Sequence, residues 1–236
     1  RGASVTLIDR QGPEKLGGLA LWAFGGMAIA GTALQRKNGI PDSPELFLVD
    51  WLRAAELSPD DKWPRAWAQR YCERAVPDIY EWLKAGGLAF MPAVQWAERG
   101  LMRPMNTVPR YHVLWGTSLH MTATFRDALL KHARTPRLKV LFNTRIDALL
   151  TRNGAVTGCA GEDEAERRPF EIEGSAVVVA TGGITGNLDR VRANWPRAWG
   201  PAPETLLNGS HPAADGLVHD AVAAIGGRLT HLDKMW

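Results

Sequence analysis

The sequence predicts an α/β protein, and three observations support this prediction. Residues 4–9 (SVTLID) form a short apolar run that ends in an acid, which is typical of a buried parallel strand. Helical segments with clear start and stop signals follow, and strand-like segments return after residue 137. Strands, then helices, then strands with one hairpin predict a Rossmann-like fold with a helical insert and a three-stranded antiparallel insert.

The helices are marked by their ends. Ser43 and Pro44 offer a cap and a first-turn proline for a helix that runs to about Glu56. Further helices are expected to begin near residue 63 and near Pro77, the latter stopping at residues 86–87. Residues 93–117 read as irregular, and a helix is expected over residues 119–132.

The second half reads mainly as strands. Asn153-Gly154 is a strong hairpin signal. Residues 176–180 (AVVVA) predict a fully apolar strand, and residues 213–225 predict a helix closed by glycines at 226 and 227. The other predicted strands cover residues 138–143, 146–151, 155–159 and 170–173.

Composition excludes several classes of protein. The chain has 236 residues, 45% of them hydrophobic, and a net charge of +3 without a basic cluster, so we expect no nucleic-acid partner. No apolar run is long enough for a membrane span. We expect a cytoplasmic protein, although a targeting segment before Arg1 would lie outside this sequence. Cys72 and Cys159 read as buried free thiols with no metal site, and most of the ten Trp residues are expected in the core.

Asp9 is the first candidate functional residue. An acid at the end of the second strand of a dinucleotide fold accepts hydrogen bonds from the adenosine ribose. An aspartate that only caps a turn explains Asp9 equally well. The glycine-rich phosphate loop that should precede this strand is absent from residues 1–9, and we expect it upstream of Arg1.

Paired glycines follow Asp9. Gly17-Gly18 and Gly25-Gly26 lie in a nearly uncharged stretch, where backbone N–H groups can approach a pyrophosphate or a flat ring without a Cβ in the way. This suits a flavin, although a glycine-rich packing loop remains an alternative. The small-residue turn after residue 180 would let a nucleotide cross the carboxyl edge of a sheet, but it also fits a plain strand-to-helix turn.

These segments together resemble a known family. Asp9-Arg10, the paired glycines, the three-stranded insert and residues 180–187 (ATGGITGN) are similar to the FAD domain of fumarate reductase-type flavoproteins. Residues 96–100 (WAERG), 108–117 (VPRYHVLWGT), 194–197 (NWPR) and 215–236 resemble 3-ketosteroid Δ1-dehydrogenase-like enzymes more closely. The resemblance covers the whole chain and implies an incomplete FAD domain over residues 1–228, lacking both termini. Within it, residues 44–135 would be the helical insert and residues 138–173 strands and a β-meander. Residues 229–236 would begin a capping domain.

The resemblance also implies FAD contacts. Asp9 would bind the ribose where many relatives carry Glu, and Leu19 and Ala20 stand where relatives place polar residues. Ile146 would contact adenine through its backbone. The full set of implied cofactor-binding residues is Asp9, Arg10, Gly17, Gly18, Leu19, Ala20, Gly25, Gly26, Ile146, Ala180, Thr181, Gly182, Gly183, Asp215 and Gly216.

Function follows from the resemblance. It implies an FAD-dependent oxidoreductase that moves a hydride between flavin and a carbon of an activated C–C bond, with a bulky apolar ring ketone as substrate. The electron acceptor stays open. Alternatives are a fumarate or succinate enzyme, an NAD-dependent dehydrogenase, or a non-catalytic piece that holds no flavin. Weak candidates for catalysis are Arg110, Tyr111, His112 and His211, each of which also fits a packed or ion-paired role.

Overall fold

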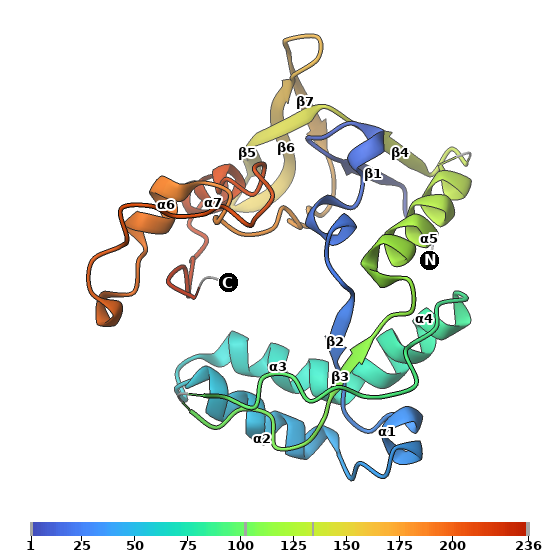
Figure 1. Cartoon of the computed structure of the whole chain (residues 1–236). Coiled ribbons are helices and arrows are strands. Elements are labelled where there is room, and N and C mark those ends of the chain that lie inside the picture. Colours follow the sequence, from blue (N-terminus) through green and yellow to red (C-terminus); the bar gives the residue numbers. More distant parts are fainter. Residues whose placement is uncertain (1, 102, 134, 235–236) are drawn as a thin grey trace. The chain divides into compact units, whose positions relative to one another are not determined.

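The computed structural model describes residues 2–101, 103–133 and 135–234 (Figure 1). Residues 235 and 236, at the end of the expected capping segment, lie outside the described residues. The chain divides into two compact units. Residues 1–19 and 129–236 form one, called the sheet unit, and residues 20–128 form the other, called the helical unit. Among the described residues, no helix is long and apolar enough to cross a membrane.

The helical unit combines a two-stranded antiparallel ribbon with a set of helices. In the ribbon, β2 (Gly26–Ala28) pairs with β3 (Tyr111–Val113), although β3 lies in a segment that was expected to be irregular. The remaining elements are α1 (Ala33–Lys37), α2 (Pro44–Ala55), α3 (Lys62–Ala75), the π-helix η3 (Val76–Tyr80), α4 (Glu81–Ala85) and α5 (Thr117–His132), which continues into the sheet unit.

Local signals set the ends of α2 as predicted. The Ser43 hydroxyl accepts the backbone N–H of Leu46, and Pro44 occupies the first turn. The helix ends where Glu56 takes a left-handed conformation, with φ of 51°. Capping of this kind satisfies N–H groups that the first helical turn leaves without partners.

The expected helix start at Pro77 is wrong. The chain stays helical from α3 through η3 into α4, and Pro77 lies inside the π-helical turn. Proline has no N–H to donate, so a helix must adjust its hydrogen bonds around it. The wider turn is that adjustment, and α4 then ends before Gly86 and Gly87, as predicted.

The core of the helical unit is built from small and aliphatic residues with a few rings. Ile29, Ala75 and Tyr80 form one cluster, and Leu83, Leu88 and Leu114 form another. A third joins Ala30 and Phe47 to the free thiol Cys72, where burial raises the pKa to about 11. The expectation that tryptophans fill the core is wrong, because seven of the nine that the structure describes are exposed. Those seven are Trp22, Trp63, Trp67, Trp82, Trp96, Trp115 and Trp199.

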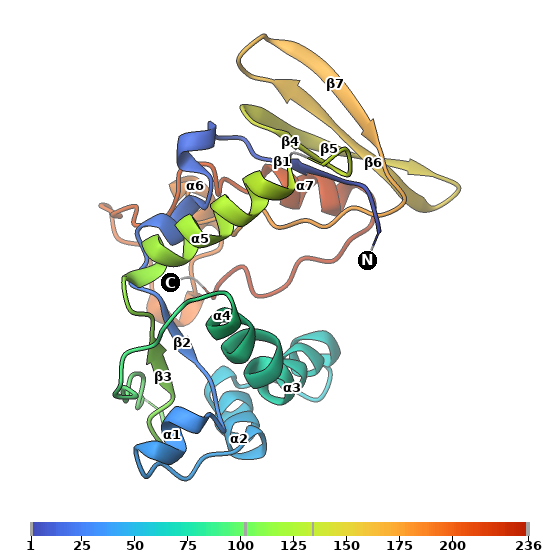
Figure 2. The ribbon, with the colours of Figure 1, turned by 90° about the vertical axis from the view of Figure 1, so that its right-hand side faces the viewer.

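The sheet unit contains the parallel pairing that the fold class predicts. Strand β1 (Val5–Ile8) pairs in parallel with β4 (Leu138–Leu141), so that both carboxyl ends lie at one edge. A separate antiparallel sheet has the order β5-β6-β7, with α7 packed on β5 (Figure 2). The other elements of this unit are β5 (Thr144–Arg152), β6 (Ala155–Asp163), β7 (Arg168–Glu173), α6 (Leu188–Ala193), α7 (Leu217–Ala224) and the 3₁₀ turns η1 (Pro13–Lys15), η2 (Gly18–Leu21, which runs into the helical unit) and η4 (Arg197–Trp199).

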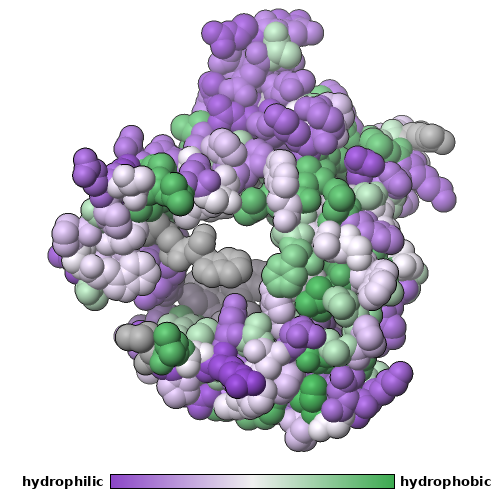
Figure 3. Space-filling view, viewed as in Figure 1, coloured by the Kyte–Doolittle hydropathy of each residue, from purple (hydrophilic) through white to green (hydrophobic). Residues whose placement is uncertain are grey.

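The predicted β-meander is confirmed. Asn153 and Gly154 join β5 to β6 with φ angles of 52° and 78°, the conformation that a tight type I′ hairpin requires. Cys159 on β6 is buried and free, as expected. Hydrophilic side chains cover the far end of this sheet at the top of the view (Figure 3).

Two expectations for the sheet unit are wrong. Residues 176–180 are not a buried strand, because they form no strand and Val178 is 88% exposed. A strand needs partners for its N–H and C=O groups, and none of the described strands pairs with this segment. Helix α7 begins at Leu217 rather than at residue 213, since Gly216, with φ of 88°, forms its N-cap. Its glycine stop at Gly226 is as predicted.

Candidate functional site

A charged junction links three distant parts of the sheet unit. The guanidinium of Arg10, just after β1, donates two hydrogen bonds to Glu164, both of 3.0 Å, and one to Asp215 at 2.7 Å. Arg145 on β5 donates to the same Glu164 carboxylate at 3.1 Å. The Arg10 hydrogen bond holds the pKa of Glu164 below its ordinary value. The junction therefore ties the end of β1 to the meander and to the start of α7.

The acidic residue before this junction has a local partner. Asp9 is half-buried, and its Oδ1 accepts the backbone N–H of Gln11 at 2.8 Å. Its backbone N–H donates to Leu141 of β4, and its C=O accepts from Thr144 of β5. Asp9 thus caps a turn at the carboxyl edge of the β1–β4 pair, the edge at which open α/β sheets bind ligands.

The first glycine pair has the backbone that its residue type predicts. Gly17 and Gly18 have φ angles of 122° and 54°, which side chains with a Cβ adopt with strain. A Cβ at Gly18 would meet nothing within 4 Å. Neighbouring Leu19 is 47% exposed and Ala20 is half-buried. The positive φ accounts for glycine at position 18, and among the described residues no atom occupies the space where a Cβ would stand.

The second small-residue turn is also open. Ala180, Thr181, Gly182 and Gly183 are all exposed. Gly182 has φ of 78°, whereas Gly183 is not in the left-handed region and has no atom within 4 Å of a built Cβ. Nothing within the protein explains why residue 183 lacks a side chain.

A close backbone contact ties this turn to the loop before α7. Gly186 donates its N–H to the Ala214 C=O at 2.9 Å, and a Cβ there would lie 2.4 Å from the His211 C=O. The next residue along this loop from Ala214 is Asp215, whose Oδ2 meets Arg10 and whose Oδ1 accepts from Leu217. These contacts connect Gly186 to the loop that carries Asp215 and, through Asp215, to Arg10.

Ile146 lies in the meander beside an irregularity. It pairs with Gly161, and the register shifts between Ile146 and Ala148. A Cβ at Gly161 would lie 1.8 Å from the Arg145 C=O. Glycine at position 161 therefore permits the close approach of β6 to β5 beside Ile146, which is the third residue of β5.

The other glycine pair belongs to the helical unit, and packing accounts for it. A Cβ at Gly25 would lie 2.8 Å from the Ser118 backbone nitrogen, and one at Gly26 would lie 2.2 Å from the Tyr111 ring. Both positions therefore require glycine for the contact of β2 with β3 and the start of α5. The sequence left open that these glycines belong to a packing loop, and that alternative explains Gly25 and Gly26.

Arg110 is buried among acids. Its side chain has 0% exposure and forms two 2.9 Å hydrogen bonds to Asp42 and one of 2.5 Å to Asp50, both also buried. Burial raises the pKa of Asp50, but hydrogen bonds from Arg110 and Thr107 outweigh this effect and leave the pKa below its ordinary value. A guanidinium enclosed in this way holds the ribbon to α2.

His112 is enclosed beside it. Nδ1 lies 2.7 Å from the Arg110 C=O and Nε2 lies 2.8 Å from the Thr32 hydroxyl. The carbonyl can only accept, so Nδ1 donates and Nε2 accepts, the pattern of a neutral imidazole. Burial also lowers the pKa of His112. Tyr111, between these two residues, is only half-buried, and burial raises its pKa.

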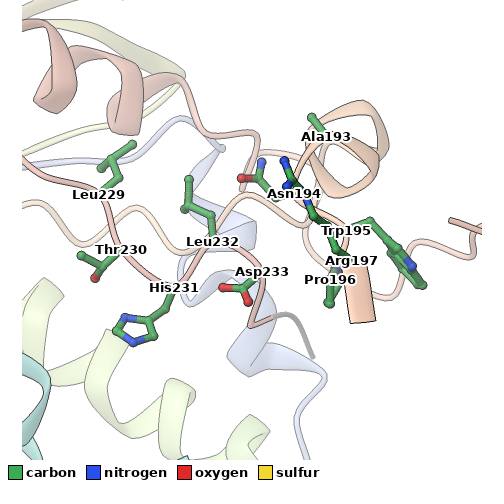
Figure 4. A pocket seen from close by; sticks show the side chains of 10 residues that line it. All are labelled: Ala193, Asn194, Trp195, Pro196, Arg197, Leu229, Thr230, His231, Leu232 and Asp233. Atoms are coloured by element: carbon green, nitrogen blue, oxygen red, sulfur yellow. The ribbon is translucent and has the colours of Figure 1, made fainter. Parts of the chain in front are cut away.

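The fourth catalytic candidate, His211, lies in the sheet unit. It is half-buried, and its Nδ1 accepts the Ala213 N–H at 3.1 Å. The sheet unit also holds an open hollow of about 490 Å³ between residues 193–197 and 229–233 (Figure 4). The ring of Trp195 turns away from residues 229–233 in this view. Within the described residues, no cluster of three or more His, Cys, Asp or Glu could hold a metal ion.

Comparison with protein families decides what kind of domain this is. The family described as "FAD binding domain" matches residues 1–236. The chain belongs to this FAD-binding family. The family resemblance seen in the sequence is confirmed, and so is the fold class that it implies.

Individual relatives agree with this assignment. A KsdD-like steroid dehydrogenase of Mycolicibacterium smegmatis is 37% identical over 253 residues, covering 100% of this chain and 46% of that protein. An NADH:fumarate oxidoreductase of Klebsiella pneumoniae is 28% identical over 79% of this chain and 18% of that protein. The chain thus spans about half the length of the steroid dehydrogenase that it matches.

A solved structure shows the same fold. The crystal structure of 3-ketosteroid-Δ4-(5α)-dehydrogenase from Rhodococcus jostii RHA1, in complex with 4-androstene-3,17-dione, superposes with a TM-score of 0.72. It is 23% identical, and the match covers 97% of this chain and 50% of that chain.

Sequence reasoning missed the residues that hold the junction together. Glu164 lies in a charged loop after β6 and Arg145 at the start of β5, and neither belongs to a recognisable motif. Their charges suggest only a solvated surface until the fold brings Arg10 between Glu164 and Asp215. Gly186 could have been found from the sequence, because it is part of the ATGGITGN segment that carries the family resemblance.

Proposed function

We propose that the sheet unit binds FAD and that the protein is an FAD-dependent dehydrogenase of ketosteroid-like ring ketones. The proposal is supported above all by the 37% identity to a KsdD-like steroid dehydrogenase along the whole chain. The match to the fumarate oxidoreductase, at 28%, is weaker and covers less of the chain. Because the chain spans less than half of the steroid dehydrogenase, activity and substrate are inferences about the protein and not properties of this domain alone.

The residues of the sheet unit fit a dinucleotide. Gly18 and Gly183 leave open space where a Cβ would be, which lets a backbone approach a phosphate or a sugar closely. Asp9 lies at the carboxyl edge of the parallel pair. Its Oδ1 accepts the hydrogen bond from Gln11, and Oδ2 takes no part in that bond. We assign the ribose hydroxyls to Asp9, the pyrophosphate to the glycine turn at 17–18, and the adenosine to the turn at 180–183.

Arg10 and Asp215 would act together at this site. Their 2.7 Å contact holds the start of α7 against the end of β1, so the two loops keep one arrangement before any ligand arrives. Preorganisation of this kind lowers the free-energy cost of binding. Leu19, Gly216 and the backbone of Ile146 complete the proposed cofactor contacts in the sheet unit.

Bound FAD would supply the hydride chemistry, and the chain would supply a proton-moving group. Arg110 and His112 are buried in the helical unit and are assigned to its stability. Tyr111 and His211 are only half-buried and remain candidates. A phenol with a raised pKa keeps its proton at neutral pH, which suits a hydrogen-bond donor.

The substrate assignment is tested with a panel. The purified protein, saturated with FAD, is mixed with an artificial redox dye and either 3-ketosteroids and other cyclic ketones or the dicarboxylates succinate and fumarate. We expect turnover of the ring ketones, since a neighbouring carbonyl acidifies the carbon that loses a proton. Turnover of the dicarboxylates alone would contradict the substrate assignment and leave the FAD assignment standing.

A further inference from the structure

The solvent-facing side of α3 carries two tryptophans that the fold does not use. Trp63 and Trp67 are 69% and 73% exposed, although indoles are usually covered at least in part. At about 100° per residue, they lie on the side of α3 opposite Ala68 and Cys72, which are buried. No described element covers this side of the helix.

Two arginines complete the same stripe. Arg70 and Arg74 are exposed, and helical spacing places them in line with Trp63 and Trp67. Arg74 forms an ion pair with Asp78 at the surface, and its side chain is 45% exposed. The stripe of Trp63, Trp67, Arg70 and Arg74, called the α3 stripe, thus presents rings at one end and cations at the other.

The order of residues in the α3 stripe is self-complementary. The midpoint between Trp63 and Arg74 and the midpoint between Trp67 and Arg70 coincide, between positions 68 and 69. If a second copy lies antiparallel about a two-fold axis at this point, each Trp of one copy faces an Arg of the other. The outermost contacts on one helix, at Trp63 and Arg74, lie about 16 Å apart at 1.5 Å per residue.

We propose that the α3 stripe is a homodimer interface in which two copies of α3 pack antiparallel through four cation–π contacts. Cations over indole rings attract, and more strongly when water is excluded. Within this chain Lys62 Nζ already lies 5.3 Å from the Trp63 ring centroid, and the Arg99 guanidinium lies 4.0 Å from that of Trp96. An isologous contact needs one self-complementary patch, which the stripe provides.

The composition and charge of the patch favour a second copy over a lipid surface. Tryptophan and arginine are the residues enriched at the energetic centres of protein interfaces. An anionic membrane would need a net positive patch, but the charges around the stripe balance. Four basic residues stand against four acidic ones: Lys62, Arg65, Arg70 and Arg74 against Asp60, Asp61, Glu73 and Asp78.

The test uses two variants, each of which is designed not to dimerise with itself. The first carries Trp63→Lys and Trp67→Lys, so that its cations would face the arginines of its copy. The second carries Arg70→Glu and Arg74→Glu, so that its acids would face tryptophans. Only their mixture restores attraction, because the introduced lysines meet the introduced glutamates and the remaining arginines meet the remaining tryptophans. All these positions are exposed, and circular dichroism checks that each variant folds.

Sedimentation velocity over a concentration series measures the assembly. We expect a concentration-dependent dimer for the unaltered chain, at least a tenfold weaker dimer for each variant, and recovery in the equimolar mixture. Trp115→Ser, which removes a tryptophan that is 62% exposed elsewhere in the helical unit, should dimerise normally. A monomer at every concentration, dimers insensitive to both variants, or no recovery in the mixture would overturn the proposal. Sedimentation of the monomer with phosphatidylserine vesicles, lost on Trp63→Lys and Trp67→Lys, would overturn it in favour of a lipid surface.

Discussion

Replacing Arg110 by methionine tests whether this residue holds the helical unit together. The substitution keeps much of the side-chain volume but removes four hydrogen bonds, three of them to the carboxylates of Asp42 and Asp50. Those carboxylates have 0% and 2% exposure, so water cannot replace the lost charge. Breaking a buried pair from one side costs about 3–5 kcal/mol, a large share of the ~5–15 kcal/mol by which domains are usually stable.

Urea unfolding followed by tryptophan fluorescence measures this loss. With a slope of roughly 1.5 kcal/mol per molar urea, the midpoint should fall by about 2–3 M. Arg53→Met is the matched control, because Arg53 also bonds Asp50 but is 42% exposed, and its loss should cost less than about 1 kcal/mol.

The pH dependence sharpens the same test. The pKa of Asp50 is lowered in the folded protein, so the stability that this carboxylate contributes is present above its unfolded pKa and is lost as pH falls. In the Arg110→Met variant the Asp50 carboxylate loses the hydrogen bond that favours its charged form, so the variant loses less stability in acid than the unaltered protein does. The gap between the two proteins should therefore narrow from pH 7 to pH 4. A loss below about 1 kcal/mol at pH 7, or a gap that ignores pH, would refute a structural role for Arg110.

Three further predictions follow from the geometry. The pKa of His112 is lowered by burial, so the unfolded chain takes up the proton first. Thermal stability should fall as pH drops below about 6.5, and in His112→Asn this part of the drop should vanish; an unchanged pH profile would refute it. Arg10→Met should raise the FAD dissociation constant by about tenfold, or roughly 1.4 kcal/mol, in a fluorescence titration. Arg152→Met, which removes an ion pair with 70% and 75% exposed partners, should leave FAD affinity unchanged. Equal affinity in the unaltered protein and in both variants would contradict a role of the Arg10 junction in FAD binding. Gly26→Ala should destabilise the helical unit by about 1–3 kcal/mol, because the new Cβ meets the Tyr111 ring at 2.2 Å, and normal stability in urea would show that the ring can move.

The sequence predicted those features that depend on neighbouring residues. The Ser43 cap, the Asn153-Gly154 turn and the glycine stop after α7 each follow from short-range backbone chemistry, and each is present. The strand predicted over residues 176–180 is wrong because a strand also depends on hydrogen-bond partners, which local composition does not specify. The helix start predicted at Pro77 is wrong for a related reason: the proline signal is local, whereas the helix continues through a π-helical turn.

The candidate site was predictable to the same extent. Positive φ angles at Gly17, Gly18 and Gly182 follow from residue type, and so does the turn at Asp9. The pairing of Arg10 with Glu164 and Asp215 joins residues up to 205 positions apart, and no short-range pattern encodes it. Burial of Arg110 and His112 was equally invisible, since a lone polar residue in a sequence does not reveal what surrounds it.

FAD retention by a Gly183→Val variant tests the central claim most directly. Gly183 is not in the left-handed region and has nothing within 4 Å of a built Cβ, so valine should not disturb the protein itself. Gly209→Val is the matched control, because Gly209 has the same two properties. Each protein is incubated with FAD and desalted, and its absorbance near ~450 nm, a property of the flavin, is compared with its absorbance from tryptophan. We expect the parent and Gly209→Val to be yellow and Gly183→Val to be colourless; equal FAD in both variants, or none in the parent, would contradict the account.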